Sequence, residues 1–215
     1  MPARIIRRRR DVPVSLPPCT MRINSRRRPQ ATEIGESTRR ISELVSAVRS
    51  YSHLDQASMQ NVDVSQGLES TLVMLRHKMP ARVRVERRYG ADVPTIDAHA
   101  GELNQVWTNL IDNAVDAMNG AGTLRLTTSH DDTGAGSGAV IVEIGDDGPG
   151  MPPEVAARAF EAFFTTKDVG KGTGLGLDIA RRIVVERHCG TITIESKPGD
   201  TVIRVRLPLR QPSAG

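Results

Sequence analysis

The stretch "KGTGLGLDIA", residues 171–180, belongs to a run in which Gly170, Gly172, Gly174 and Gly176 alternate with other residues. An amphipathic helical pattern follows directly. Glycine loses more backbone freedom on folding than any other residue, so this density is costly to order and suggests a functional loop. The loop leads into a helix N-terminus, whose free N–H groups favour an anion such as phosphate.

Two standard phosphate-binding motifs do not fit this loop. A P-loop requires Ser or Thr after Gly-Lys, where this chain has Gly172. A dinucleotide motif requires a third glycine where the chain has Leu175, Leu177 or Ile179. The Gly- and Thr-rich approach over 160–177 is instead typical of a mobile lid, and its three phenylalanines make a simple linker a poor interpretation.

A helix predicted over 99–118 carries the next polar feature. Its polar face aligns Gln105, Asn109, Asn113 and Asp116 at helical spacing. Asparagine is a poor helix former, so two of them one turn apart invite explanation. An amide oxygen suits Mg²⁺ that already carries phosphate oxygens and waters. A plain solvated face remains equally compatible with this pattern alone.

The segment "EIGDDGPGM", residues 143–151, joins a buried strand to a glycine-rich turn. Gly148 and Gly150 allow a tight turn and a close approach to a flat ligand. The carboxylate of Asp146 needs a hydrogen-bond donor if it is buried at the strand end. The exocyclic amine of adenine would serve, although an ordinary Asp-Gly turn is a common alternative.

The pattern along the whole chain predicts an α+β fold, a two-layer sandwich of about five mostly antiparallel strands with three helices on one face. Asp63 is expected to cap the first of these helices, with Gln66 as its capping-box partner. "VPTID" (93–97) is predicted as a loop, and a helical turn is expected near 153–159. The helices are predicted at 64–79, 99–118 and 174–188, and the strands at 82–88, 123–128, 139–144, 191–196 and 201–207.

The N-terminal 30 residues are expected to be a disordered Arg- and Pro-rich tail. Nine arginines and one aspartate give this tail a charge of +8, so residues 31–215 carry −4 of the total +4. The arginines are compatible with an arm that binds nucleic acid or an anionic membrane, and also with a tail that has no partner. The second interpretation is favoured, because no aromatic residue interleaves the arginines. Residues 211–215 are a second predicted tail.

Residues 31–58 are predicted as a long helix whose core spans 32–56. Ile34, Ile41 and Val48 repeat every seven residues, with Leu44 and Tyr51 between them. One helix cannot bury this stripe alone, so we expect a homodimer through residues 32–56. No apolar run approaches a membrane span. Two cysteines in unlike contexts suit a reducing, cytoplasmic location.

Four segments in order resemble the ATP-binding catalytic domain of sensor histidine kinases, within the Bergerat-fold ATPase superfamily. "NQVWTNLIDNAVDAM" is similar to the N box, "DDGPGM" to the G1 box, "FEAFFTTK" to the F box and "GKGTGLGL" to the G2 box. The closing hairpin "GTITIESKPGDTVIRVRLPL" also fits. The resemblance covers about residues 60–210, is closest to kinases of the nitrogen-regulation type, and implies that ATP and Mg²⁺ are bound.

The resemblance also implies roles for individual residues. Asn113 would coordinate Mg²⁺, with Asn109 beside the metal and the phosphates, and Asp146 would accept from the adenine amine. Asn109, Asn113 and Lys167 would be the catalytic residues. The implied nucleotide contacts are Asp146, Gly148, Gly150, Thr165, Thr166, Gly172, Thr173, Gly174, Leu175 and Gly176.

Position 109 bears on the reaction. Gyrase-like relatives carry a glutamate there to activate water, whereas an asparagine cannot act as a base at neutral pH. Transfer of the γ-phosphoryl group is therefore favoured over hydrolysis. None of the five histidines precedes an acidic residue as the family's acceptor histidine does: His53, His77, His99, His130 and His188.

We therefore expect a kinase region that phosphorylates a histidine on a partner or on a missing segment, with a response regulator or a protein bearing the H box as partner. Two alternatives stay open. One is a non-catalytic, ATP-binding regulatory module, and the other is a serine kinase of the anti-sigma type.

Overall fold

The computed structural model describes residues 58–132, 138–167 and 172–210 of the 215-residue chain. Three predictions lie outside these ranges, namely the tail at 1–30, the helix at 31–58 apart from its last residue, and the tail at 211–215. Gly170 and Lys171 of the glycine-rich run also lie outside them.

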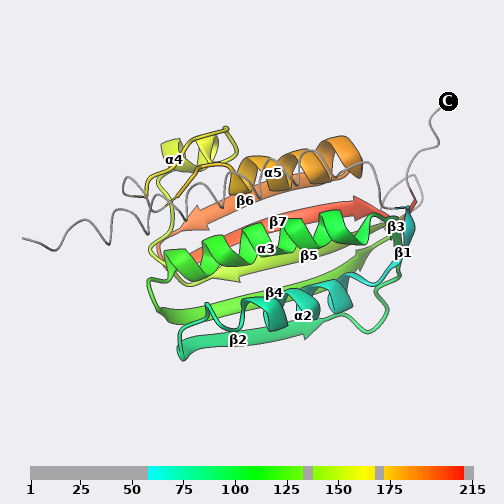
Figure 1. The fold of residues 1–215 in the computed structure, drawn as a ribbon, viewed down its shortest axis with the longest axis horizontal. Coiled ribbons are helices and arrows are strands. Elements are labelled where there is room, and N and C mark those ends of the chain that lie inside the picture. Colours follow the sequence, from blue (N-terminus) through cyan, green and yellow to red (C-terminus); the bar gives the residue numbers. More distant parts are fainter. Residues whose placement is uncertain (1–57, 133–137, 168–171, 211–215) are drawn as a thin grey trace, which may run out of the picture.

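A twisted five-stranded sheet forms one layer of the domain, in the order β2-β4-β5-β7-β6 (Figure 1). β2 pairs with β4 in parallel, and the other three pairings are antiparallel. The parallel pair needs a long crossover between its strands, which a helix provides. The bounds are β2 Arg82–Tyr89, β4 Ala121–Asp131, β5 Ala139–Asp146, β6 Thr191–Lys197 and β7 Asp200–Pro208.

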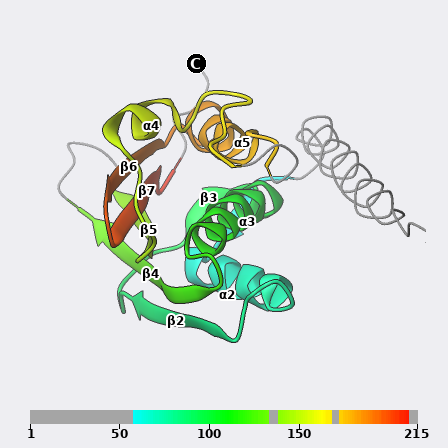
Figure 2. The same cartoon turned by 90° about the vertical axis from the view of Figure 1, so that its left-hand side faces the viewer.

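Three helices cover one face of this sheet (Figure 2). They are α2 (Val64–Leu75), α3 (Ala100–Ala117) and α5 (Gly176–Arg182), and α5 continues into a π-helical turn, η1 (Ile183–Arg187). A short helix, α4 (Pro153–Arg158), lies beside β6. The predicted α+β sandwich with three helices over a five-stranded sheet is confirmed.

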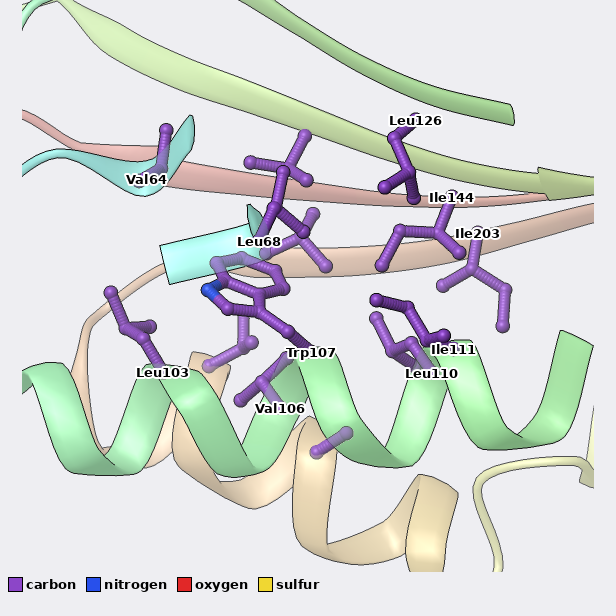
Figure 3. Packing of buried hydrophobic residues seen from close by; sticks show 14 of the residues in the cluster. Val64, Leu68, Leu103, Val106, Trp107, Leu110, Ile111, Leu126, Ile144 and Ile203 are labelled. Carbon is purple, nitrogen blue, oxygen red and sulfur yellow. The ribbon is translucent and has the colours of Figure 1, made fainter. Parts of the chain in front are cut away.

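α3 lies at the centre of the core, and Figure 3 shows its apolar side chains against the sheet. Trp107 is 1% exposed and packs in the same cluster as Leu68 of α2. On the sheet that faces the helix, Leu126, Ile144 and Ile203 are direct register neighbours on β4, β5 and β7. Burying each such side chain stabilises the fold by about 1.5–3 kcal/mol, so α3 is firmly held in place.

The start of α2 follows the prediction, but its end does not. Asp63 is the N-cap, and its carboxylate accepts from the N–H groups of Ser65 (2.8 Å) and Gln66 (3.2 Å). The helix ends at Leu75 rather than at residue 79, and the Lys78 and Met79 N–H groups turn back to the Leu75 carbonyl. The predicted helix over 64–79 was therefore four residues too long.

Two further expectations need correction. Part of the predicted loop at 93–97 is a strand, β3 (Ile96–Ala98), which pairs antiparallel with β1 (Gln60–Val62). The helix expected over 174–188 is α-helical only from Gly176 to Arg182, and η1 completes it. At the end of this turn, Nδ1 of His188 lies 3.0 Å from the Ile183 carbonyl oxygen, five residues earlier.

Among the helices that the described ranges contain, none combines the length and apolar character needed to cross a membrane.

Candidate functional site

The predicted metal-binding amides and the glycine-rich loop lie together in the structure. Gly176 begins α5 and faces α3, so that a Cβ added to it would lie 3.7 Å from Asn113 Nδ2 and 3.8 Å from Asn109 Oδ1. These are ordinary contact distances, and glycine leaves this space open. The start of α5 and the polar face of α3 are more than 60 residues apart in sequence. They approach each other at Gly176, where no side chain lies between them.

Asn109 is held by its neighbour one turn earlier. Its Oδ1 accepts a hydrogen bond from Gln105 Nε2 at 3.1 Å, as the spacing along the polar face predicts. Its Nδ2 is buried and has no hydrogen-bond partner among the described residues. A buried donor without an acceptor costs about 1–3 kcal/mol. Among the described residues this donor stays without an acceptor, and a phosphate oxygen of a ligand would suit it.

Lys167 belongs to the predicted lid (160–177), and its side chain reaches the same end of α3. Its Nζ lies 2.6 Å from Asp116 Oδ2 and 3.4 Å from Asn113 Oδ1. Its aliphatic stem runs beside Gly172, where an added Cβ would lie 3.1 Å from Lys167 Cδ. The Asn113 oxygen thus already contacts one cation, which shows that it is accessible to cationic groups.

The two ends of the lid meet through their backbones. The Phe163 N–H donates to the Gly174 carbonyl at 2.9 Å. Gly174 has a φ of 67°, and a Cβ added to it would lie 2.5 Å from the Phe163 carbonyl carbon. Glycine is required at 174 by this contact within the protein. Phe163 itself has a φ of 64°, unusual for a bulky residue, and its side chain is 72% exposed.

The lid threonines make local hydrogen bonds. Thr165 Oγ1 accepts from the Lys167 N–H at 3.2 Å, and Thr173 Oγ1 accepts from the Leu175 N–H at 3.4 Å. Leu175 is the N-cap position of α5. Thr166 is exposed. These residues therefore shape the loop on both sides of Lys167 and Gly172.

Asp146 lies at the end of β5 with only 5% of its surface exposed. Its Oδ1 accepts from the Gly148 N–H at 3.0 Å. Burial raises the pKa of Asp146, opposed by the Gly148 hydrogen bond and the Arg125 guanidinium. Because carboxylate oxygens accept several hydrogen bonds, this buried group suits a ligand that presents a donor.

The two glycines of the turn are fixed by different neighbours. A Cβ at Gly148 would lie 2.7 Å from Asp146 Oδ1 and 3.2 Å from the Ala117 carbonyl at the end of α3. Gly150 has a φ of 77°, and a Cβ there would lie 2.5 Å from the Lys197 carbonyl oxygen. The turn is tied to the β6–β7 hairpin by the Gly199 N–H, which donates to the Gly148 carbonyl at 2.9 Å.

The predicted site residues therefore form a connected arrangement along α3. The amides, Lys167 and Gly176 meet on its helix face, and Asp146 with its turn packs against its C-terminal end. The contact between Asp116 and Lys167 was not predicted from the sequence. Asp116 lies on the polar face recognised from spacing, but nothing in the sequence indicates a partner 51 residues away.

Residues 98–211 match the family described as histidine kinase-, DNA gyrase B-, and HSP90-like ATPase. The chain belongs to this family. It is 34% identical to the sensory histidine kinase/phosphatase NtrB of Rhodobacter capsulatus over 184 residues, which cover 82% of this chain and 51% of that protein. It is 29% identical to the sensor kinase CckA of Brucella abortus, covering 84% of this chain and 20% of that one.

Solved structures show the same fold. The catalytic domain of the histidine kinase ThkA matches with a TM-score of 0.63 at 26% identity, covering 72% of this chain and 99% of that domain. Full-length ShkA in complex with AMPPNP matches with a TM-score of 0.69 at 28% identity, covering 86% of this chain and 39% of ShkA. The predicted catalytic domain of the sensor-kinase kind is confirmed, and the chain spans about half or less of these curated relatives.

Proposed function

We propose that this domain binds Mg-ATP and transfers its γ-phosphoryl group to a histidine of a partner or of another protein segment. The observation that carries the proposal is the meeting of Asn113, Lys167 and Gly176 at one place on α3. An amide oxygen, an ammonium group and an open glycine are what a metal-bound triphosphate requires. The similar kinases NtrB and CckA, and the AMPPNP complex of ShkA, support it.

The residues divide the nucleotide between them in this proposal. Asp146 accepts from the adenine amine, and Asn113 offers its amide oxygen to Mg²⁺. When bound, Mg²⁺ would neutralise charge on the β- and γ-phosphates. The unpaired Nδ2 of Asn109 supports a hydrogen bond to a phosphate oxygen. Its oxygen already accepts from Gln105, so a role for Asn109 as a metal ligand stays a prediction.

Phosphoryl transfer forms a bond between an imidazole nitrogen and the γ-phosphorus and breaks the bond to the bridging oxygen, with ADP as leaving group. In this proposal Lys167 stabilises the phosphate charge, and its contact with the Asn113 oxygen supports that role. Asn109 has an amide where a water-activating residue would need a carboxylate, which favours transfer over hydrolysis.

The test incubates the full chain with γ-³²P-labelled ATP, alone and with a separately supplied helical hairpin bearing an acceptor histidine. We expect label on the hairpin, and loss of label on Asn113→Ala. Asn61→Ala, an exposed asparagine in β1, is the matched control and keeps the activity. ATP binding without label anywhere would instead indicate a regulatory module, and label stable to acid on a serine would indicate a serine kinase.

Three expectations stay predictions. A response regulator is the proposed final acceptor, and a homodimer through 32–56 is the proposed assembly, with that helix outside the described residues. The cytoplasmic location rests on cysteine usage alone.

A further inference from the structure

Asp116 forms an ion pair with Lys167 of the predicted lid. Its Oδ2 lies 2.6 Å from Lys167 Nζ, and the same nitrogen lies 3.4 Å from Asn113 Oδ1. We propose that Asp116 is a positioning residue that holds the Lys167 ammonium group against the amide oxygen of Asn113. Lys167 and the metal of Mg-ATP then compete for that oxygen. This inference rests on the proposed function and names a step that precedes it.

Charge makes the two states compete. An ammonium group and a divalent cation repel each other, so binding of one at the amide oxygen disfavours binding of the other. Mg-ATP loading therefore favours the departure of Lys167 from Asn113. The released ammonium then has phosphate oxygens as partners, which carry more negative charge than the single carboxylate of Asp116.

The exposure of the pair suits a reversible contact. The Lys167 and Asp116 side chains are 34% and 57% exposed, and ion pairs in such positions contribute little net stability. The stem of Lys167 rests beside Gly172, so its path from the lid to α3 is constrained while its charged end is free to change partner. Asp116 therefore sets the position of the Lys167 ammonium group through an ion pair that is weak enough to break reversibly.

The chain contains a matched pair for comparison. Lys78 Nζ lies 3.0 Å from Asp112 Oδ2, one turn earlier on α3. Lys78 belongs to the turn after α2, outside the lid. This pair has the same chemistry on the same helix and no contact with the Asn113 oxygen among those the structure gives.

The experiment measures amine protection by acylation of the full chain, followed by mass spectrometry of the Lys167 and Lys78 peptides. Without nucleotide, Asp116→Asn should raise the modification rate of Lys167 by about two- to fivefold, the range of an exposed pair, and leave Lys78 unchanged. Asp112→Asn should do the reverse. Asp116→Glu should restore protection of Lys167. With saturating Mg-ADP, Asp116→Asn should no longer change the Lys167 rate.

A second measurement addresses competition directly. Calorimetric titration of ADP at increasing Mg²⁺ should show that Asp116→Asn needs about two- to fivefold less Mg²⁺ for half-maximal binding, with Asp112→Asn unchanged. Equal Lys167 rates in wild type and Asp116→Asn, an effect that persists in Mg-ADP, or an unchanged or higher Mg²⁺ requirement would each overturn the proposal. Neither readout uses phosphoryl transfer, so a failure of labelling is a separate result.

Discussion

The buried carboxylate of Asp146 accepts a hydrogen bond from the backbone N–H of Gly148, 3.0 Å away and two residues on. The same Oδ1 lies where a side chain at 148 would begin, 2.7 Å from an added Cβ. The contact therefore orients the carboxylate, and a side chain at position 148 would have to displace it. The same arrangement buries the carboxylate of Asp146, and burial disfavours its negatively charged form.

Asp146→Asn should stabilise the nucleotide-free domain at neutral pH. Because burial raises the pKa of Asp146, the folded state binds a proton more readily than the unfolded state, and ionisation at neutral pH costs stability. The gain should fade as the pH falls through the folded-state pKa towards about 4. Urea unfolding at several pH values measures it. Asp147→Asn is the control with opposite sign, since hydrogen bonding from Thr123 lowers the pKa of Asp147.

The same variant should change base selectivity. The asparagine oxygen keeps the Gly148 N–H, so its amide NH₂ faces the base. Adenine presents an amine at that edge and guanine an oxygen. Losing one hydrogen bond should weaken ADP binding by about tenfold, while GDP binding improves relative to ADP. Calorimetry with both nucleotides checks this, and unchanged preference would argue against Asp146 as the adenine contact.

Gly174→Ala should open the lid without unfolding the core. An added Cβ would collide with the Phe163 backbone, and the φ of 67° costs a non-glycine residue about 1–2 kcal/mol. We expect faster hydrogen exchange at the Phe163 amide and at least about tenfold weaker nucleotide binding. Gly101→Ala is the matched control. It lies in α3 with no atom within 4 Å of an added Cβ, and should be neutral or stabilise by about 0.5–1 kcal/mol.

His188 should make stability fall in mild acid. Its Nδ1 donates to the Ile183 carbonyl, and its Nε2 accepts from the His99 N–H at 3.2 Å, which requires a neutral ring. Burial lowers the pKa of His188, so the unfolded state binds the proton first and stability is lost as the pH falls below about 6.5. His188→Gln should flatten this dependence in thermal melts and cost about 1–3 kcal/mol at neutral pH. His130→Gln, at an exposed position, should leave the slope intact.

Asp63→Ala should destabilise the domain by about 1 kcal/mol, because two N–H groups at the start of α2 lose their acceptor. Asp63→Asn, which keeps an acceptor oxygen, should recover most of this loss. Urea unfolding of both variants beside the wild type makes the comparison. Equal stability of the alanine variant and the wild type would show that water replaces the cap.

The sequence predicted elements whose signals are local. Asp63 marked the start of α2 through cap chemistry, and the alternating residues of β2, β6 and β7 marked strands. The end of α2 was missed because Pro80 limits where a helix can continue but does not require it to reach that point. β3 was missed because three residues show no period, and its existence depends on pairing with β1, more than 30 residues earlier.

Parts of the candidate site were predictable for a similar reason. Asn109 and Asn113 share a helix face, so their spacing is read directly, and the Gln105 contact to Asn109 follows from it. The structural requirement for glycine at positions 150 and 174 was not predictable from the sequence. Both are enforced by distant backbone, from the β6–β7 hairpin and from Phe163, and such close approaches arise only when the chain is folded.

The hydrogen bond from the Phe163 N–H to the Gly174 carbonyl joins the two ends of a loop. The length of chain between such ends changes the free energy of closure by only about 0.6 kcal/mol for each doubling. Insertions between Lys167 and Gly172 should therefore leave α3 and the strands undisturbed. This domain thus offers a position at which a peptide tag or a fluorescent label is expected to be tolerated, next to the candidate site.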